Sequence, residues 1–352
     1  MQLHLMKKTD VPAVQDAANK NRKRNMKIRK LELQEHINTR QVYEEIFPTD
    51  SQSFVDYYYT EKTKDNEIYV IEEDGAIQSM IHLNPYILMV NGKEAVSHYI
   101  VAVATREAYR KRGYMASLLA ETLNVMHERR EAFTFLMPAR EGIYLPHGFR
   151  TVYEQEHSYR TELEPDDRVV KDKDVYQLAE FAEKRLAEQF DVYAKRTPEY
   201  YLRLIKEYGS DGGKLVIKEE GNTIAGGYIL VPELSETKPK IMVRIVHLEQ
   251  MLLSLKLNYF MGACFEVVDP IIKENNKILL LTGTEYSGVM LMEGKPEQSE
   301  GVLTIEALGS LVFGSKTVEE IAVENGVSMS DRLKEELKKI IPLSRIYLNE
   351  IV

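Results

Sequence analysis

The stretch Ser97-His-Tyr-Ile-Val-Ala-Val-Ala-Thr-Arg-Glu-Ala-Tyr-Arg-Lys-Arg-Gly-Tyr-Met-Ala-Ser-Leu-Leu119 decides how the first part of the chain folds. Its beginning predicts a strand, because Tyr99, Val101 and Val103 alternate with smaller residues. Its end predicts a helix, because apolar residues then recur at helical spacing. The loop between them, Arg110-Lys-Arg-Gly113, carries three cations and a glycine at the expected helix start.

This loop suits a polyphosphate. The first turn of a helix has free N–H groups, and the helix dipole favours an anion at that end. Gly113 allows the backbone to approach a ligand closely. A solvated basic turn is the alternative interpretation of these four residues taken alone.

Composition limits the class of protein. The chain has 352 residues, enough for two or three domains, and its 44% hydrophobic and 29% charged residues are typical of a soluble globular protein. The net charge of −9 argues against nucleic-acid binding. No apolar run is long enough to cross a membrane. The single cysteine, Cys264, excludes an internal disulfide and a metal cluster, so we expect no metal and a cytoplasmic location.

The chain divides into four predicted segments. Residues 1–25 carry six cations and two anions without apolar periodicity, so we expect a flexible extension. The first strand is predicted at Met26–Leu31. From about Lys238 the pattern changes again, and a strand at Ile241–Val246 is expected to open a C-terminal domain. Further elements are predicted there: strands at 263–268, 277–282 and 286–291, and helices at 304–311, 317–324 and 331–341.

An internal repeat links the middle of the chain to its beginning. Residues 68–83 align without gaps on residues 215–230, and an aromatic-rich helix is predicted before each copy. A hairpin together with its preceding helix favours a duplicated half-domain. The second copy lacks any Arg-x-x-Gly loop, so only the first copy is expected to bind a cofactor.

Val101-Ala-Val103 followed by Arg110-Lys-Arg-Gly113 resembles the acetyl-CoA loop of the GCN5-related N-acetyltransferases (GNAT), although Met115 differs from that family's pattern at the last position. The order of segments, together with Glu141-Gly-Ile-Tyr144 and Met242–Val246, resembles the enhanced-intracellular-survival (Eis) acetyltransferases over Met26 to Val352.

The Eis resemblance implies an α+β fold with two GNAT-like mixed-sheet domains in tandem and a sterol-carrier-protein-like α/β domain. The catalytic GNAT domain would span residues 26–155, the degenerate second one 156–237 and the last domain 238–352, with the C-terminus reaching the active site. The family acetylates amines, including aminoglycosides and lysine side chains, and forms hexamers. The resemblance therefore implies a homo-oligomer.

The resemblance also assigns roles to residues. It makes Tyr144 the general acid, with His147 a nearby alternative. It makes the C-terminal carboxylate, on Val352, the base, with Glu350 or a water relay as alternatives. The residues expected to bind the cofactor, acetyl-CoA, are Val101, Val103, Arg110, Lys111, Gly113 and Tyr114, of which the two valines would pair with the pantetheine arm.

We therefore expect an N-acetyltransferase that transfers an acetyl group from acetyl-CoA to a primary amine by direct attack on the thioester. The alternative is a non-catalytic protein that senses acyl-CoA or binds lipid. Partners other than acetyl-CoA and a small-molecule or peptide amine, such as nucleic acid or a membrane, are not expected. Asp56 and Tyr57 to Tyr59 either wall the acceptor pocket or pack in the core, and His82 and His98 are expected in the core.

Overall fold

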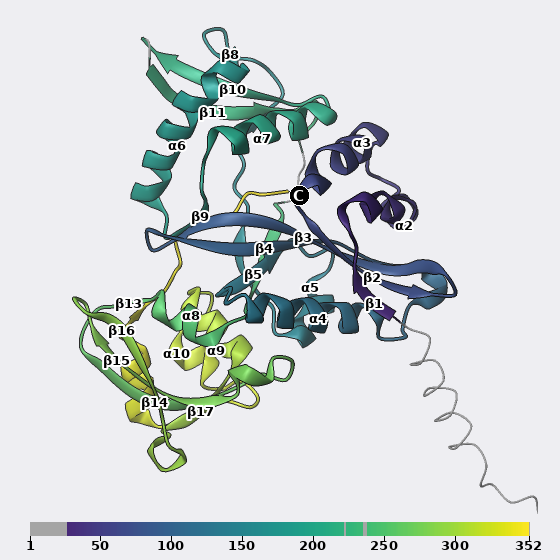
Figure 1. The fold of residues 1–352 in the computed structure, drawn as a ribbon. Coiled ribbons are helices and arrows are strands. Elements are labelled where there is room, and N and C mark those ends of the chain that lie inside the picture. The colour runs from purple at the N-terminus through teal and green to yellow at the C-terminus, as the bar shows by residue number, and fades with distance from the viewer. Residues whose placement is uncertain (1–26, 222, 235–237, 352) are drawn as a thin grey trace, which may run out of the picture.

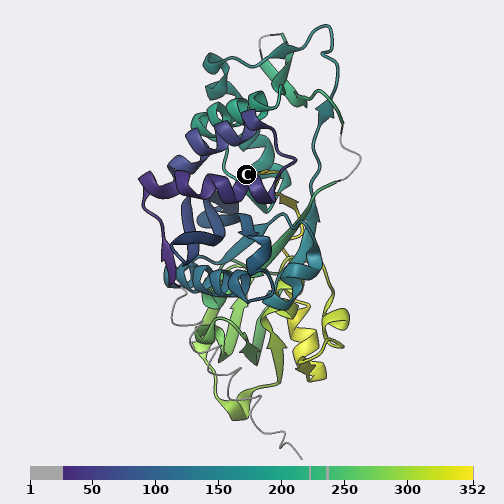
Figure 2. The same ribbon diagram turned by 90° about the vertical axis from the view of Figure 1, so that its right-hand side faces the viewer.

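The computed structural model of the chain describes residues 27–221, 223–234 and 238–351. The predicted extension and Val352 lie outside these residues. The described chain forms three lobes stacked in a row, with the N-terminal lobe in the middle (Figures 1 and 2). Its sheet runs in the order β1 (Lys27–Lys30), β2 (Glu67–Glu73), β3 (Ala76–Val90), β4 (Lys93–Thr105), β5 (Phe133–Leu136), β12 (Lys240–Ile245) and β6 (Arg150–Glu154).

Helices cover both faces of this central sheet (Figure 1). On one face α4 (Tyr114–Glu128) packs with Tyr69 and Ile71 of β2. On the other face α2 (Arg40–Ile46) and α3 (Gln52–Thr60) pack with Ile68 and Val70. Alternate residues of one strand thus enter two different cores, as strand geometry requires. The strand and the helix predicted on either side of Arg110–Gly113 are confirmed as β4 and α4.

The central sheet takes strands from all three predicted domains. The strand predicted to open the third domain is β12, and it lies between β5 and β6 of the first lobe. Two further strands, β9 (Val192–Ala194) and β20 (Ile346–Tyr347), extend the sheet beside the end of β3. This placement of β12 differs from the expectation. Residues 241–245 are all buried, so their pattern predicts a central strand without indicating which sheet holds it.

The second lobe is a four-stranded sheet, β7 (Tyr159–Arg160), β11 (Thr223–Leu230), β10 (Lys214–Glu220) and β8 (Arg168–Val169), covered by α6 (Val175–Gln189) and α7 (Pro198–Ser210). Its β10–β11 hairpin is the predicted second copy of β2–β3. The register of the first hairpin shifts between Ile71 and Glu72, and that of the second shifts between Lys218 and Glu219. These positions are equivalent in the alignment of the two segments, so the bulge is repeated together with the hairpin.

The third lobe has a sheet in the order β16 (Gly288–Glu293), β15 (Lys277–Thr284), β14 (Met261–Val268), β17 (Gly301–Thr304) and β18 (Ser328–Met329). Its helices are α8 (Leu248–Leu253), α9 (Ile305–Val312), α10 (Val318–Ile321) and α11 (Asp331–Leu337). The predicted strands are present. The predicted helix over residues 331–341 is too long, because Ile340 and Ile341 form β19 and pair with β13 (Lys256–Leu257). Within the described chain, no helix is both long and apolar enough to cross a bilayer.

The C-terminal segment leaves the third lobe and runs back across the first (Figure 1). The Gln155 Nε2 donates to the carbonyl oxygens of Leu348 and Glu350 at 3.1 and 2.9 Å. The Asp191 N–H donates to the Arg345 carbonyl at 2.7 Å. These bonds place the end of the described chain between the first and second lobes.

A buried ion pair joins the first and third lobes. Arg244 of β12 and Asp269, which follows β14, are 2.7 Å apart, and neither side chain is exposed to water. The Arg244 Nε also donates to the His147 carbonyl at 2.7 Å. The Asp269 carboxylate accepts the N–H groups of Ile271 and Ile272 as well. Because every charged group here has partners, the pair is fixed in one geometry.

We expect Arg244→Met to lower the free energy of unfolding by about 3–5 kcal/mol, the usual cost of leaving one partner of a buried ion pair uncompensated. Urea denaturation measures this change. Lys334→Met, which removes an exposed i,i+3 pair with Asp331, is the control and should change little. Equal stabilities of the Arg244 variant and the wild type would contradict the assigned role of the pair.

Candidate active site

The strands β4 and β5 separate near the middle of the central sheet. They are parallel and pair only at Tyr99 with Phe135 and at Ile100 with Leu136. The strand β5 ends at Leu136, whereas β4 continues to Thr105. Residues 101–105 of β4 therefore have no strand partner on that side among the described residues, and their backbone groups form an open edge.

Val101 and Val103 lie on this open edge and are half-buried. Between them Ala102 has φ +51°, and the register of β3 and β4 shifts at this point. A bulge of this kind increases the local twist and turns a strand away from its neighbour. The separation of β4 from β5 thus has a local cause in the backbone of β4.

The basic loop follows β4 and leads into α4. Lys111 and Gly113 both have positive φ, +61° and +83°. The first intrahelical bond of α4 runs from the Ser117 N–H to the Gly113 carbonyl at 2.9 Å. The N–H groups of residues 114–116 therefore have no partner within the helix. An anion placed at this end would meet these N–H groups and the positive end of the helix dipole.

The three cations of the loop differ in their contacts. The Arg110 Nε donates to the Thr105 carbonyl at 3.2 Å, which holds the side chain against the end of β4. Arg112 donates to the Ala108 carbonyl at 2.8 Å, and its guanidinium lies 4.5 Å from the centre of the Tyr109 ring. Both arginines are exposed or nearly so, and Lys111 is exposed. The loop therefore presents positive charge around the start of α4.

Tyr144 ends the short helix α5 (Glu141–Tyr144) and is buried. Its ring packs edge to face on Phe149, with ring centres 5.8 Å apart. Burial raises the pKa of Tyr144 to about 12, so the phenol keeps its proton at neutral pH. Burial, helped by the Arg244 charge, lowers the pKa of the alternative acid, His147. A neutral imidazole cannot supply a proton as an imidazolium does.

The end of the chain lies beside the separated strands. The Tyr99 hydroxyl donates to the Ile351 carbonyl at 3.1 Å. The Tyr99 ring stacks on Phe135 at 4.9 Å. Ile351 also packs against the hydrophobic cluster that contains Val101 and Ala102. The predicted base, Val352, is outside the described residues, but the residue before it lies next to the open edge of β4.

Glu350, the alternative base, is buried and tightly held. Its Oε1 accepts from Arg196 at 2.9 Å and from the Tyr200 hydroxyl at 3.1 Å. Its Oε2 is also buried but has no hydrogen-bond partner among the described residues. A carboxylate in this state can accept one further donor.

The aromatic residues of α3 pack mainly in the core. The Tyr58 hydroxyl bonds to the His82 Nδ1 and that of Tyr59 to Thr39, each at 2.9 Å. The Tyr57 hydroxyl donates to Glu207 at 3.1 Å. Asp56 is exposed and pairs with Arg40. The three tyrosines are thus packed in the core, whereas exposed Asp56 neither packs there nor lines the cavity described next. His82 and His98 are buried as expected, His98 bonding to Glu131 at 2.8 Å.

A polar cavity of about 270 Å³ lies between the first and second lobes. Its walls include Lys62, Tyr86, Tyr200, Glu207 and Glu350. Burial raises the pKa of Glu207 and lowers that of Lys62 to about 8. The Tyr86 ring lies 6.4 Å from that of Tyr99, so the cavity borders the site where β4 and β5 separate.

The residues around this cavity were not predicted as a site, apart from Glu350. They come from η2 (Lys62–Lys64), β3, α7 and the C-terminal segment, so no motif or spacing connects them. The only local signal is a charged residue within an otherwise amphipathic helix, Glu207 in α7, and such residues are usually solvated.

Comparison with protein families identifies two domains. Residues 27–152 match the acetyltransferase (GNAT) domain, and residues 261–349 match the sterol carrier protein domain. The chain thus carries a GNAT acetyltransferase domain followed by a sterol carrier protein domain. This finding confirms the two predicted domain types, the enzyme class and, with it, acetyl-CoA as the co-substrate. The comparison with curated proteins gave no match.

Solved structures share the whole architecture. Eis1 from Mycobacterium abscessus has 12% sequence identity and a TM-score of 0.67, covering 93% of this chain and 100% of that chain. A GCN5-related N-acetyltransferase from Anabaena variabilis has 14% identity and a TM-score of 0.72 with the same coverage. A probable N-acyltransferase from Enterococcus faecalis has 14% identity and a TM-score of 0.71, again with this coverage. The fold is therefore Eis-like, as the resemblance implied.

We expect Gly113→Ala to weaken acetyl-CoA binding about tenfold or more, because an L-residue at positive φ shifts the N–H groups at the start of α4. Isothermal titration calorimetry measures the affinity. Gly75→Ala is the matched control, since Gly75 has a similar φ of +76° and no neighbour that an added methyl group would meet. Both variants should lose about 1–2 kcal/mol of stability. An equal loss of affinity in both would rule out a specific role for Gly113.

Proposed function

We propose that this protein transfers an acetyl group from acetyl-CoA to a primary amine, in an aminoglycoside, a polyamine or a lysine side chain. The observation that carries the proposal is the convergence of three features at one place. These are the open edge of β4, the basic start of α4 and the described end of the chain beside Tyr99. The first two features suit the pantetheine arm and the pyrophosphate of coenzyme A.

In the proposed binding mode, Val101 and Val103 pair with the pantetheine arm as an added strand would. Arg110, Lys111, Gly113 and Tyr114 hold the pyrophosphate. Each charge-assisted hydrogen bond to the phosphates would contribute about 1.5–3 kcal/mol. The exposed cations and the free N–H groups of the first turn support this assignment.

In the proposed reaction, the amine nitrogen attacks the thioester carbonyl carbon and forms the C–N bond. The C–S bond then breaks, and the coenzyme A thiolate takes the Tyr144 proton. The proton lost by the amine goes to the Val352 carboxylate, which releases it to solvent, and the Tyr144 phenolate regains a proton from solvent. The phenol, whose pKa burial raises to about 12, carries its proton at neutral pH and so has one to donate to the departing thiolate.

The polar cavity next to Tyr99 is the proposed acceptor site. Glu207 and Glu350 line it, and the unsatisfied Oε2 of Glu350 matches the donor capacity of an ammonium group. Of the three cations on the same walls, Lys195 pairs with Glu94, Arg203 pairs with Asp65, and Lys62 donates to the Tyr86 hydroxyl at 2.7 Å. The two buried carboxylates therefore favour a cationic acceptor.

The domain boundaries, the cellular location and the oligomeric state are also part of the proposal. We place the catalytic GNAT unit at residues 26–155, its degenerate copy at 156–237 and the sterol-carrier-protein-like unit at 238–352, with β12 contributed to the first sheet. We further propose that the protein is cytoplasmic and assembles as a homo-oligomer, in line with the Eis-like fold.

Tyr144→Phe should lower turnover roughly 10²-fold or more, because the thiolate loses its proton donor, while acetyl-CoA affinity stays unchanged. Thiol release from acetyl-CoA with a polyamine, a lysine peptide and an aminoglycoside measures turnover. Tyr69→Phe, which removes another buried phenol, on β2 and bonded to Glu67 instead, is the control. A normal rate in Tyr144→Phe would remove this residue from the mechanism. If the wild type binds acetyl-CoA tightly but turns over no amine, the alternative of a non-catalytic acyl-CoA-sensing protein is favoured instead.

Amidation of the C-terminus should lower turnover without changing the melting temperature, since it removes the Val352 carboxylate charge and keeps the side chain. A protein rebuilt by the same ligation with a free carboxylate is the control. Acceptor turnover is measured at several pH values for both. Full activity of the amidated protein would assign proton acceptance to another group, and Glu350→Gln would then test the alternative.

A further inference from the structure

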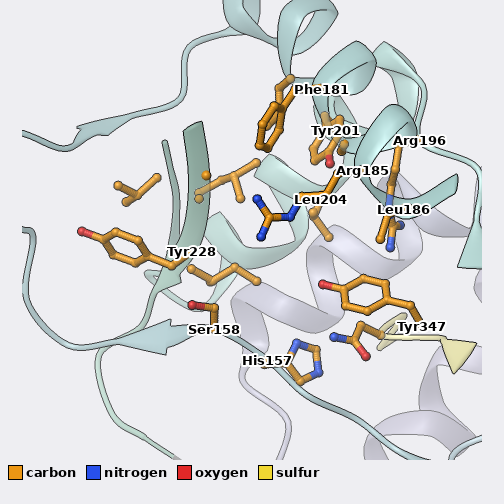
Figure 3. Close-up of a pocket in the computed structure, with 18 of the residues that line it drawn as sticks. His157, Ser158, Phe181, Arg185, Leu186, Arg196, Tyr201, Leu204, Tyr228 and Tyr347 are labelled. Carbon is orange, nitrogen blue, oxygen red and sulfur yellow. The ribbon is translucent and has the colours of Figure 1, made fainter. Parts of the chain in front are cut away.

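The second lobe contains a larger cavity, of about 490 Å³, that the acetyl-transfer site does not use. It lies between α6, α7, the sheet of β10 and β11, and the C-terminal segment (Figure 3). This volume is within the range of pockets that hold small organic molecules. The cavity belongs to the lobe that repeats the first hairpin without the Arg-x-x-Gly loop.

The walls of this cavity are aromatic and apolar. Seven of the lining residues are aromatic, among them Phe181, Tyr201, Tyr228 and Tyr347 (Figure 3). Leucines of α6 and α7 fill the space between the rings. Aromatic side chains favour offset stacking or edge contacts with another ring. The walls thus suit a flat aromatic body better than a polar sugar or a flexible polyamine.

The charged side chains that line the cavity are all cationic. Its lining contains Arg185, Arg196 and Lys218, and none of its lining residues is Asp or Glu. Arg196 is paired with Glu350, and Lys218 lies 3.6 Å from Asp167. Arg185 is exposed and makes no hydrogen bond or ion pair with any described residue, and its guanidinium reaches in among the lining side chains (Figure 3). One cation at this cavity is therefore available to a ligand.

The other titratable groups described at the cavity do not change the conclusion that Arg185 is available to a ligand. Burial lowers the pKa of His157 to about 4, so its imidazole is neutral at neutral pH. Its Nε2 is engaged by the Gln155 side chain at 2.9 Å. The Tyr208 hydroxyl is paired with that of Tyr159 at 3.2 Å. The cavity therefore combines neutral aromatic walls with an unpaired guanidinium.

We propose that this cavity is a second ligand site, which binds a small aromatic carboxylate. The ring of the ligand stacks among the aromatic side chains of α6, α7 and β11. The carboxylate accepts the two parallel N–H groups of Arg185, a geometry that the planar guanidinium provides. This inference concerns binding in the second lobe and does not depend on the proposed acetyl transfer.

The new site is next to the proposed acceptor cavity but chemically distinct from it. Tyr200 and Leu204 line both cavities and form the wall between them. The Arg196 side chain lines the aromatic cavity, and its partner Glu350 lines the acceptor cavity. The aromatic cavity offers the unpaired guanidinium of Arg185, whereas the acceptor cavity offers the buried carboxylates of Glu207 and Glu350. The two cavities therefore select ligands of opposite charge.

Calorimetric titration of the full-length protein with three probes of one shape tests the proposal: naphthalene-2-carboxylate, 2-naphthylmethanol and 2-naphthylmethylamine. We expect one equivalent of the carboxylate to bind, about tenfold or more tighter than the alcohol, as one charge-assisted contact provides. The amine should bind more weakly than both. Equal affinities for the three probes, or the tightest binding for the amine, would overturn the proposal.

Variants then locate the site. Arg185→Glu should abolish the preference for the carboxylate, whereas Lys184→Glu, the same charge reversal at the exposed neighbouring position of α6, should keep it. Ala182→Trp, which fills the cavity from its α6 wall, should remove binding of all three probes. In the wild type, saturating acetyl-CoA should leave the affinity for the carboxylate probe unchanged, because the two sites are separate. Carboxylate binding that survives both Arg185→Glu and Ala182→Trp would place the ligand elsewhere and refute the assignment.

Discussion

A guanidinium that water cannot reach holds the catalytic part of this molecule together. Arg244 lies on a strand of the central sheet, pairs with Asp269 of the third lobe and bonds to the carbonyl of His147, three residues after Tyr144. A buried ion pair costs much of its attraction in desolvation, so its main contribution is geometric. It fixes the third lobe against the turn that follows Tyr144.

The returning segment then brings distant parts of the chain to the separated strands. Tyr99 holds the Ile351 carbonyl, and Arg196 holds the Glu350 side chain. The first contact belongs to the central sheet and the second to the second lobe, so the end of the chain is positioned from two sides. An acetyltransferase domain alone would lack both the tail and the buried carboxylate of Glu350 beside the cavity that we propose as the acceptor site. The proposed site therefore needs all three lobes.

Local sequence patterns were enough to predict the structural elements that are formed by short contiguous segments. The β4–loop–α4 unit around Gly113 and the repeated hairpin were predictable, because strand alternation, helical spacing and turn residues are encoded over a few residues. The position of β12 between β5 and β6 was not, since a strand buried on both faces fits any central position. The cavity around Lys62 and Glu207 was not predictable either, because residues more than a hundred positions apart form it.

Two buried ion pairs differ in how many hydrogen-bond donors their carboxylates have. One joins Arg196 and Glu350, and the other joins Arg244 and Asp269. Asp269 accepts several backbone and side-chain donors, whereas one oxygen of Glu350 has none among the described residues. A fully satisfied pair serves as a structural joint. A buried oxygen without a donor is costly unless a ligand supplies one. The unsatisfied pair forms the boundary between an aromatic cavity with cations and a polar cavity with carboxylates, so the cost is concentrated where two ligands would meet the protein.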